Sequence, residues 1–284
     1  MIVTVDIGNS RIKCAQWMAE DIIARSVSSY ECGAGSGEHR KVFDQLFVSV
    51  QKPQRILAVC VGHHDMRQSL TDWVSENWRL EVEFLATSRT YGDIVNAYAD
   101  PAKHGADRWA AVVAAREAEP ESPLCVISAG TAITFDLVEK GGRHLGGYIL
   151  PSYKSMRSAL LSDTADLESF TDVAVKAVEA DPHMQYHAAG ADANDDEWHS
   201  GPALIEAVPA DTRAAIDQGI QLMIQAGVHE ISGLAQARLG SSMKIIVTGG
   251  FATTLLKYPS IPEMLHKPDL VMQGLYSILM RPDG

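Results

Sequence analysis

The sequence predicts an α/β protein made of two similarly ordered halves. Two observations point to this class: short apolar, β-branched runs end at glycines, and an Ala-rich helical pattern with a broad apolar stripe lies between such runs. The third observation is a repeat, because an apolar run, a small-residue turn and a returning run occur near residue 1 and again near residue 124. We therefore expect an N-terminal domain over 1–118 and a C-terminal domain over 119–284.

The first half has clear signals for each element. Strands are expected over 2–7, 11–17, 21–30, 55–62 and 79–86, and helices over 64–78 and from Gly105 to Glu117. The first three strands follow one another at hairpin distances, so an antiparallel arrangement is expected. The run 55–62 is continuously apolar, which is typical of a strand covered on both faces.

The second half repeats this order from residue 124. Strands are expected over 124–129, 132–138, 143–150 and 244–248, and a long helix over 211–239 with Gly240 as its stop. The expected apolar positions of that helix are Ile216, Ile220, Met223, Ile231 and Leu234.

A polar, acidic stretch over 180–202 interrupts this pattern and is interpreted as a surface insertion. Its three histidines, His183, His187 and His199, stand among acidic residues that could bind a metal ion. Their spacing is irregular, so we favour a solvated loop over a metal site.

Composition excludes several functional classes. The chain has 284 residues, of which 46% are hydrophobic and 21% charged, so a largely disordered protein is excluded. The formal charge of −12 makes nonspecific nucleic-acid binding unexpected, because such a surface repels phosphates. No apolar run is long enough for a transmembrane helix, and the first ten residues are typical of a strand rather than a signal peptide.

The four cysteines, Cys14, Cys32, Cys60 and Cys125, include no CxxC pair. A disulfide framework or a structural zinc site is therefore not expected, and the reducing cytoplasm is the expected location.

Two small-residue turns could bind phosphate. One follows the first strand at Asp6-Ile7-Gly8-Asn9-Ser10, and the other follows the strand that ends at Ser128-Ala129, at Gly130-Thr131-Ala132. Each offers a glycine, a hydroxyl and backbone N–H groups, which together can hold phosphate oxygens. Either turn alone would be an ordinary hairpin, but their recurrence favours a phosphate clamp at a cleft between two similar domains.

Asp6 and Lys13 extend the first turn chemically. Asp6 stands at a strand end, where a carboxylate can hold the Mg²⁺ that accompanies nucleotide phosphates, directly or through water. Lys13 lies in the returning strand within reach of the same phosphates, although it could equally be a solvated strand lysine.

The segment from Tyr98 to Arg108 is the third candidate. Gly105 is interpreted as a flexible hinge before a helix whose first turn contains Asp107 and Arg108. Asp107 could simply cap the helix, since the dipole favours an acid there. Arg108 is locally unfavourable at that position and therefore indicates an anion site, beside which Asp107 could accept a hydroxyl proton during phosphoryl transfer.

These motifs together resemble those of the type III pantothenate kinases, in the actin-like, acetate- and sugar-kinase superfamily. The resemblance runs almost the full length. Its motifs are D-x-G-N-[TS]-x-x-K at 6–13, Y-x-x-P-x-x-x-G-x-D-R at 98–108, GTAxTxD at 130–136, HxGGxIxP at 144–151, TAxL at 164–167, D-T-x-x-A-I-x-x-G at 211–219 and TGG at 248–250.

The resemblance implies two ribonuclease-H-like domains with mixed, five-stranded-type sheets, a homodimer, and ATP-dependent phosphorylation of pantothenate. It implies that the phosphate-binding residues are Asp6, Gly8, Asn9, Ser10, Lys13, Gly130 and Thr131. The implied pantothenate-binding residues are Tyr98, Gly105, Ala106, Asp107, Arg108 and Thr212, with Thr212 contributed across the dimer. Asp107 is then the proton acceptor, and Arg108 binds the substrate carboxylate.

One position departs from the family pattern. The family usually has an aspartate two residues before the Gly of GTA, where it binds K⁺ or ammonium, and Ser128 stands there in this chain. A neutral hydroxyl is a weaker cation ligand than a carboxylate, so the monovalent-cation site is in question. Two alternatives to the pantothenate kinase remain open, a non-catalytic accessory relative and a kinase of another small hydroxy acid on the same fold.

Overall fold

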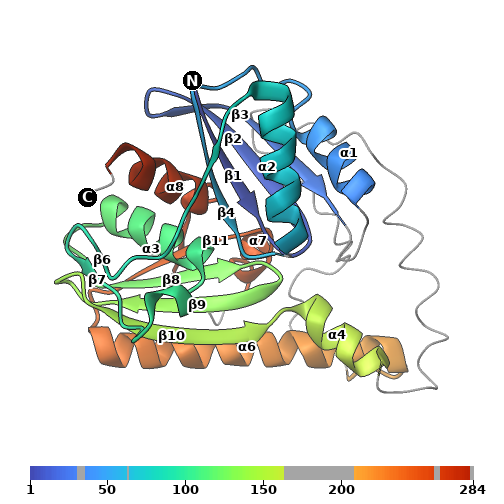
Figure 1. The fold of residues 1–284 in the computed structure, drawn as a ribbon. Helices are drawn as coiled ribbons and strands as arrows, with labels where there is room; N and C mark the ends of the chain where they lie inside the picture. The colour runs from blue at the N-terminus through green and yellow to red at the C-terminus, as the bar shows by residue number, and fades with distance from the viewer. Residues whose placement is uncertain (31–35, 63, 163–207, 259–262, 282–284) are drawn as a thin grey trace. The chain divides into compact units, whose positions relative to one another are not determined.

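The structure, a computed structural model, describes residues 1–30, 36–62, 64–162, 208–258 and 263–281 (Figure 1). The acidic stretch 180–202 with its three histidines lies outside the described residues, as do the motif at 164–167 and Cys32. The interpretations of these segments stay predictions.

Contacts divide the chain into two compact units. The first comprises Met1–Leu124, Asp136–Gly146 and Asp269–Gly284, and the second comprises Cys125–Phe135 and Gly147–Pro268. The chain therefore enters and leaves the first unit more than once. The expected domain boundary between 118 and 119 stays a prediction.

The first unit contains a five-stranded sheet in the order β3-β2-β1-β4-β5. Its strands are β1 (Ile2–Ile7), β2 (Arg11–Met18), β3 (Asp21–Ser29), β4 (Arg55–Cys60) and β5 (Val82–Phe84). The first three strands pair antiparallel, whereas β4 is parallel to both β1 and β5. The expected antiparallel order is confirmed, but the strand expected over 79–86 is only three residues long.

Helices cover both faces of this sheet because side chains of a strand alternate between its faces. α1 (Ser36–Leu46) and α2 (His64–Trp78) pack on one face, and α3 (Ala106–Ala118) and α8 (Leu270–Met280) pack on the other (Figure 1). The first core joins Val3, Val5 and Ile7 to Phe43, Leu46, Met66 and Leu70. The second joins Ala15, Trp17, Leu57 and Val59 to Ala110, Met272 and Leu275.

This alternation decides where Asp6 lies. Val5 and Ile7 belong to the core under α1 and α2, so Asp6 between them projects from the opposite face, on which α3 packs. Gly274 lets α8 approach α3 closely, because a Cβ there would lie 1.9 Å from the Ala110 carbonyl oxygen. Close packing of these helices fixes α3 beside the carboxyl end of β1.

A second five-stranded sheet has the order β10-β9-β8-β11-β12, which repeats the order of the first. Its strands are β8 (Leu124–Ala129), β9 (Ala132–Val138), β10 (His144–Pro151), β11 (Lys244–Thr248) and β12 (Leu265–His266). The expected repetition of the two halves is confirmed at the level of strand order. A short sheet of β6 (Thr90–Tyr91) and β7 (Ile94–Val95) and a 3-10 helix η1 (Pro101–Lys103) precede α3.

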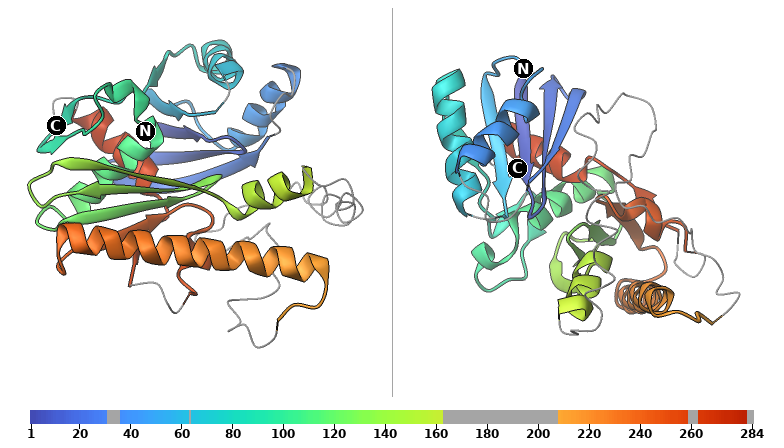
Figure 2. Two further views of the ribbon diagram at one scale, coloured as in Figure 1. Left: turned by 90° about the horizontal axis from the view of Figure 1, so that it is seen from below. Right: turned by 90° about the vertical axis from the view of Figure 1, so that its right-hand side faces the viewer.

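The remaining helices are α4 (Tyr153–Ser162), α6 (Thr212–Leu239) and α7 (Ala252–Leu255). Figure 2 shows α6 as one long helix with α4 beside its N-terminal part, where the Tyr153 hydroxyl donates to Asp217 at 2.6 Å. Asp211 caps α6 by accepting from Ala214 N–H, and Gly240 ends it at φ 89°, as expected. Every helix in the described ranges is too short or too polar to cross a bilayer.

The apolar stripe expected on α6 is partly wrong. Ile220 and Ile231 are buried as expected, but Met223 is 63% exposed and Leu234 is 48% exposed. The buried stripe instead consists of Ile220, Ile224, Val228, Ile231 and Ala235, at spacings of three and four residues. α6 therefore has apolar side chains on two faces, and only one of them faces the core of its unit.

Candidate active site

The turn between β1 and β2 is closed by its own backbone. Gly8 N–H donates to the Arg11 carbonyl at 3.0 Å, and the Tyr30 hydroxyl donates to the Gly8 carbonyl at 2.5 Å. Gly62 lies against the same carbonyl, since a Cβ on Gly62 would be 2.8 Å from the Gly8 oxygen and 2.6 Å from the Tyr30 hydroxyl. The turn is thus held from the ends of two other strands, and it presents Asn9 and Ser10 at its tip.

Asp6 and Lys13 flank this turn as a cross-strand pair. They are directly opposite each other in the register of β1 and β2, so their side chains share one face of the sheet. Burial raises the pKa of Asp6 to about 6, with Lys13 opposing and Asp107 adding to the rise. The carboxylates of Asp6 and Asp107 are therefore close enough to repel each other, with a lysine beside them.

Asp107 lies in the first turn of α3, beside Gly105. Its Oδ1 accepts the backbone N–H of Arg108 at 2.8 Å, and a Cβ on Gly105 would lie 2.8 Å from that same oxygen. Gly105 has an ordinary φ of −52°. The structure thus gives a reason for this glycine other than the expected hinge, namely room for the Asp107 carboxylate. Burial raises the pKa of Asp107, against the hydrogen bond from Arg108 N–H.

Arg108 is buried, and a carboxylate and a phenol hold its guanidinium. Nε donates to Asp136 Oδ2 at 2.9 Å, Nη2 donates to Asp136 Oδ1 at 2.6 Å, and Nη1 donates to the Tyr98 hydroxyl at 3.1 Å. Burial lowers the pKa of Arg108, but the Asp136 carboxylate and the Tyr98 hydroxyl raise it more, so the group stays charged. Ala106, the first residue of α3, is partly buried.

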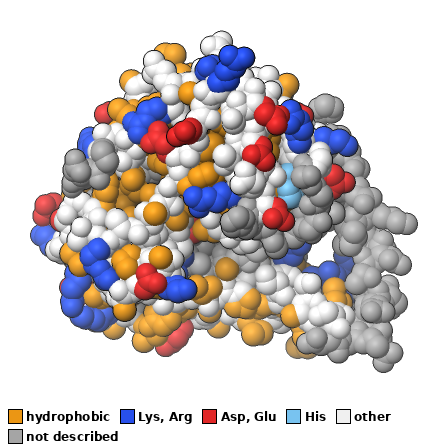
Figure 3. All heavy atoms as spheres, in the orientation of Figure 1, with side chains coloured by type: hydrophobic (Ala, Val, Ile, Leu, Met, Phe, Trp, Pro, Cys, Tyr) orange, Lys and Arg blue, Asp and Glu red, His pale blue; other side chains and the backbone are white. Residues whose placement is uncertain are grey.

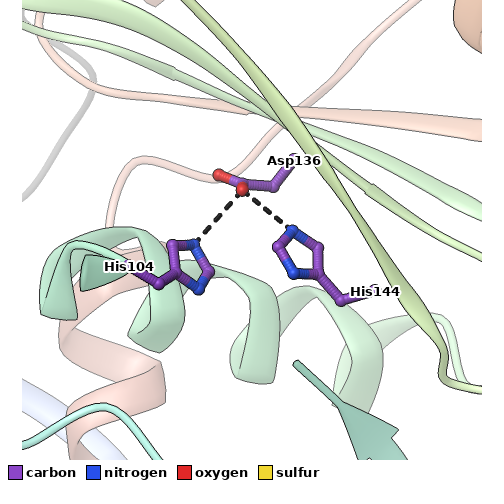
Figure 4. A group of neighbouring side chains, drawn as sticks. All are labelled: His104, Asp136 and His144. Carbon is purple, nitrogen blue, oxygen red and sulfur yellow. Dashed lines mark hydrogen bonds and ion pairs between the residues drawn. The ribbon is translucent and has the colours of Figure 1, made fainter. Parts of the chain in front are cut away.

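Two histidines face the same carboxylate oxygen of Asp136 (Figure 4). His144 Nε2 lies 3.0 Å from Oδ1, and His104 Nε2 lies 3.2 Å from it, although less well aligned. All three side chains are buried. Burial raises the pKa of Asp136, but the two imidazoles and Arg108 lower it far more and hold it well below its usual range.

The neighbouring backbone assigns the tautomer of each ring. Ala97 N–H donates to His144 Nδ1 at 3.4 Å. Tyr98 N–H donates to Asn96 Oδ1 at 3.0 Å, which turns the Asn96 amide nitrogen toward His104 Nδ1 at 3.2 Å. Both Nδ1 atoms therefore accept, and each ring carries its proton on Nε2, aimed at Asp136.

The His104, Asp136 and His144 ligand atoms lie within 4.8 Å of one another, a geometry that could suggest a metal ion. The positions of the ring protons argue against a metal ion. Both Nε2 atoms are donors, whereas a metal ligand must offer a lone pair, and the guanidinium of Arg108 already occupies the carboxylate. This cluster is a carboxylate held by three donor groups and does not fit a metal.

In the second unit, the turn between β8 and β9 closes in the same way as the first. Gly130 N–H donates to the Ala132 carbonyl at 2.9 Å. A Cβ on Gly249 would lie 2.2 Å from the Ala129 carbonyl oxygen, so Gly249 packs on the last residue of β8, whereas Gly62 packs on the glycine of the first turn. The Thr131 carbonyl accepts the Ser155 hydroxyl at 3.2 Å. Ser128 is the penultimate residue of β8 and is partly buried.

The first unit brings together Tyr98, Arg108, Asp107, Asp6 and Lys13. Ser128, Gly130, Thr131 and Thr212 belong to the second unit, where Thr212 is the exposed first residue of α6.

Sequence reasoning missed Asn96, His104, Asp136 and His144. Asp136 ends the motif at 130–136 and His144 begins the motif at 144–151, so both had a motif position but no assigned task.

A model of the type III pantothenate kinase family matches residues 2–192. A curated type III pantothenate kinase from Nitrosococcus oceani is 29% identical over 281 residues, which cover 97% of this chain and 92% of that one.

Two solved structures show the fold. A proposed Baf family transcriptional activator from Campylobacter jejuni has a TM-score of 0.51 at 18% identity, covering 99% of this chain and 100% of that chain. A proposed 2-dehydro-3-deoxygalactonokinase from Sinorhizobium meliloti has a TM-score of 0.51 at 13% identity, with the same coverage. At these identities the two structures support a shared architecture of two mixed sheets flanked by helices, as expected for actin-like kinases.

Proposed function

Because the chain belongs to the family of type III pantothenate kinases, we propose that it transfers the γ-phosphoryl group of ATP to the hydroxyl of pantothenate, giving 4′-phosphopantothenate for coenzyme A biosynthesis. The observation that carries this proposal to individual residues is the meeting of Asp6 and Asp107 beside Arg108 at the N-terminus of α3. Phosphoryl transfer requires these groups: a carboxylate near the phosphates, a proton acceptor and a cationic anchor.

ATP binding is assigned to the two glycine turns and Lys13. Phosphate oxygens are assigned to the backbone N–H and side-chain groups of Asn9 and Ser10 in the first turn and of Thr131 in the second. Gly8 and Gly130, whose own N–H groups close the two turns, would let the phosphates approach the backbone. Lys13, which shares a sheet face with Asp6, adds a positive charge near the first turn.

Mg²⁺ fits Asp6. Burial and the neighbouring Asp107 raise the pKa of Asp6, and a divalent cation with oxygen ligands would offset the concentrated negative charge. Asp6 would hold the ion directly or through water, and the ion would neutralise charge on the phosphate oxygens.

Pantothenate is assigned to Tyr98 and to the segment from Gly105 to Arg108. The Asp107 carboxylate takes the proton of the substrate hydroxyl while that oxygen attacks the γ-phosphorus and the bond to the leaving ADP oxygen breaks. A carboxylate with a raised pKa is a stronger proton acceptor than an ordinary one, and burial supplies that rise for Asp107. Its hydrogen bond with Arg108 N–H fixes one oxygen and leaves the other for the proton.

Arg108 binds the substrate carboxylate through N–H groups that Asp136 and Tyr98 do not use. A guanidinium has five N–H groups, and within the described residues three of them donate to these two partners. The other two lie one on each terminal nitrogen, which suits the two oxygens of a carboxylate.

A homodimer is proposed from the second unit. Tyr148 and Ile149 of β10, Leu160 of α4, and Leu222 and Met223 of α6 are between 44% and 63% exposed. Figure 3 shows hydrophobic side chains on the surface over α6. Burying exposed apolar side chains of this kind against a second copy is favourable, and Thr212 at the start of α6 would then contribute to the partner's pantothenate site.

Mixing two inactive variants tests this arrangement. If Thr212 acts across the dimer, co-refolded Asp107→Asn and Thr212→Ala chains form mixed dimers with one intact site and recover about a quarter of wild-type activity. No recovery beyond the sum of the separate variants contradicts it.

The activity itself is tested by ATP-dependent phosphorylation on purified protein. Pantothenate is compared with a panel of other small hydroxy acids, and products are identified by mass. We expect pantothenate to have the highest kcat/KM by a wide margin. A better hydroxy acid would point to another kinase on this fold, and absence of any product would favour the non-catalytic relative.

The cytoplasm is the proposed location, on the cysteine pattern alone.

A further inference from the structure

We propose that Asp136, oriented by His104 and His144, is a positioning residue that turns the Arg108 guanidinium so that its remaining N–H groups meet the carboxylate of the substrate. This inference rests on the proposed role of Arg108 as the carboxylate anchor. It adds a requirement that the family motif does not state: Arg108 binds the substrate carboxylate only while the Asp136 carboxylate pairs with the other edge of the guanidinium.

The first step concerns the plane of the guanidinium. One ion-pair contact would fix the position of the group but leave it free to rotate about its last bonds. The two bonds from Nε and Nη2 to the two oxygens of Asp136, at 2.9 and 2.6 Å, fix both position and plane. The contact of Nη1 with Tyr98 adds a third point. The plane that the substrate carboxylate must match is therefore set before the substrate arrives.

The second step concerns what fixes Asp136 itself. Its Oδ1 faces three donors: Arg108 Nη2 at 2.6 Å, His144 Nε2 at 3.0 Å and His104 Nε2 at 3.2 Å. The two rings are neutral donors because Ala97 and Asn96 donate to their other nitrogens. The two hydrogen bonds to Oδ1 come from separate segments, Arg108 of α3 and His144 of β10, and with His104 Nε2 near the same oxygen they leave this carboxylate one orientation.

The third step connects the network back to the pocket. Tyr98 contacts Arg108 through its hydroxyl, fixes the Asn96 amide through its backbone N–H, and stacks on His104 with ring centroids 4.8 Å apart. His104 in turn stacks on His144, also at 4.8 Å. A change at either histidine is therefore transmitted to both Asp136 and Tyr98, the two partners of Arg108.

The same helix offers a matched control. Arg116 of α3 is also buried and is also held through Nε and Nη2 by an aspartate, Asp93, at 3.0 and 2.5 Å. Arg116 lies more than two turns beyond Arg108, and it has no proposed contact with substrate. Asp93 differs from Asp136 in being 53% exposed and in accepting both of these bonds on Oδ2. Asp93→Asn thus removes the carboxylate partner of a second buried arginine in the same helix without touching the proposed anchor.

The experiment measures kcat/KM of the full-length protein for pantothenate and for its neutral analogue, in which an alcohol replaces the carboxylate. Wild type prefers the acid if Arg108 is the anchor. In Asp136→Asn we expect the pantothenate KM to rise about 10- to 100-fold and the preference for the acid to disappear, while the ATP KM stays within about twofold. Asp93→Asn keeps the wild-type preference.

A second pair of variants covers the case in which Asp136→Asn does not fold. His144→Phe keeps a stacking ring but removes the donor, and His144→Gln restores an N–H near the same position. Under the proposal the Phe variant loses preference for the acid and the Gln variant regains part of it. Equal preference in both, at the wild-type level, would show that His144 only packs and would overturn the proposal.

The outcomes separate this inference from the proposed function. A wild-type protein that does not phosphorylate pantothenate contradicts the function, and one that uses the acid and the alcohol equally contradicts the Arg108 anchor. If wild type prefers the acid and Asp136→Asn keeps that preference, or loses activity toward both substrates in the same proportion, Asp136 is only structural and the inference fails.

Discussion

The turn after β1 and the turn after β8 occupy the same place in two sheets of the same strand order, yet they carry different chemistry. Two residues before the glycine, the first has Asp6 and the second has Ser128. Asp6 faces Lys13 across the hairpin, and its pKa rises to about 6 because it is buried and close to Asp107. The comparison teaches that two turns with similar backbone closure can have different chemistry, with the ionisable groups beside the turn of the first unit.

The glycines that close the two turns differ as well. Gly62 approaches the Gly8 carbonyl and the Tyr30 hydroxyl with ordinary backbone angles, whereas Gly249 has φ 99° and would put a Cβ 2.2 Å from the Ala129 carbonyl. The second turn therefore depends on its closing glycine in two ways, conformation and space, and the first depends on space alone.

The largest expected effect concerns Asp107, which lies beside the turn of the first unit. Asp107→Asn should keep the fold and lose about 10²- to 10⁴-fold in kcat, because the proposed proton acceptor is gone. Steady-state kinetics with denaturation curves measures both quantities. If Asp107 only caps α3, the change lowers stability by about 1 kcal/mol and leaves kcat near the wild-type value, which contradicts the catalytic assignment.

The next effect distinguishes the two closing glycines. Gly249→Ala should destabilise the protein by about 3 kcal/mol or more, since backbone must move and a left-handed conformation must be kept. Gly62→Ala should cost about 1–2 kcal/mol, because the Tyr30 hydroxyl can turn aside, but it should also raise the ATP KM as Gly8 shifts. Urea unfolding of both variants measures the difference. Equal losses would show that neither the left-handed φ nor the closer approach at Gly249 adds to the cost.

A smaller effect concerns pH and Asp6. Since the pKa of Asp6 is raised in the folded state, to about 6 from its usual 3.8, the native protein holds this proton more tightly than the unfolded chain does. Its contribution to stability therefore falls as pH rises from about 4 to about 6. Asp6→Asn should remove that loss and be more stable at pH 7 by on the order of 1 kcal/mol, discounted because the carboxyl is only partly buried.

Unfolding free energies at several pH values, for wild type and Asp6→Asn, measure this effect. A variant less stable than wild type at pH 7 would show that Asp6 stabilises the fold rather than straining it. Phosphoryl transfer should be lost in the same variant, so activity and stability should change in opposite directions.

The smallest expected effect is at the neutral turn. With Ser128 in place of the usual carboxylate, we expect activity to be nearly the same in sodium, potassium and ammonium buffers of equal ionic strength. Ser128→Asp should create a potassium response, since it restores a charged oxygen ligand. Strong, saturable potassium activation of the natural protein would show instead that Ser128 leaves the site working.

Local patterns predicted the elements whose sequence has a clear period. The β1 to β3 strands, α2, α3 and α6 were predicted close to their observed bounds, because alternation, Ala-rich stripes and glycine stops are local signals. Helices α1 and α8 were not predicted. α8 is apolar almost throughout, with Gly274 in its middle, and its helical form follows from packing on α3 and the first sheet.

The candidate site likewise contains residues that local motifs indicate and residues that only the fold brings together. Asp6, Lys13, Asp107 and Arg108 were proposed as site residues because each stands in a short motif. His104 lies 32 residues before Asp136, and His144 lies 8 residues after it, and these spacings match no metal-ligand or helical pattern. Only the fold shows that they share one carboxylate oxygen. Met223 and Leu234 show another limit of sequence patterns. Apolar residues at helical spacing do not reveal whether they face the core of their own unit, and these two are exposed.

The measurement that tests the central claim most directly is the substrate dependence of Arg108→Lys. A lysine keeps the charge but lacks the planar fork that pairs with Asp136 on one edge and, as we propose, with the substrate carboxylate on the other. The account predicts that the pantothenate KM rises by about tenfold or more while the ATP KM changes little. An equal rise in both KM values would contradict it, because Arg108 would then serve the phosphates or the fold rather than the carboxylate of pantothenate.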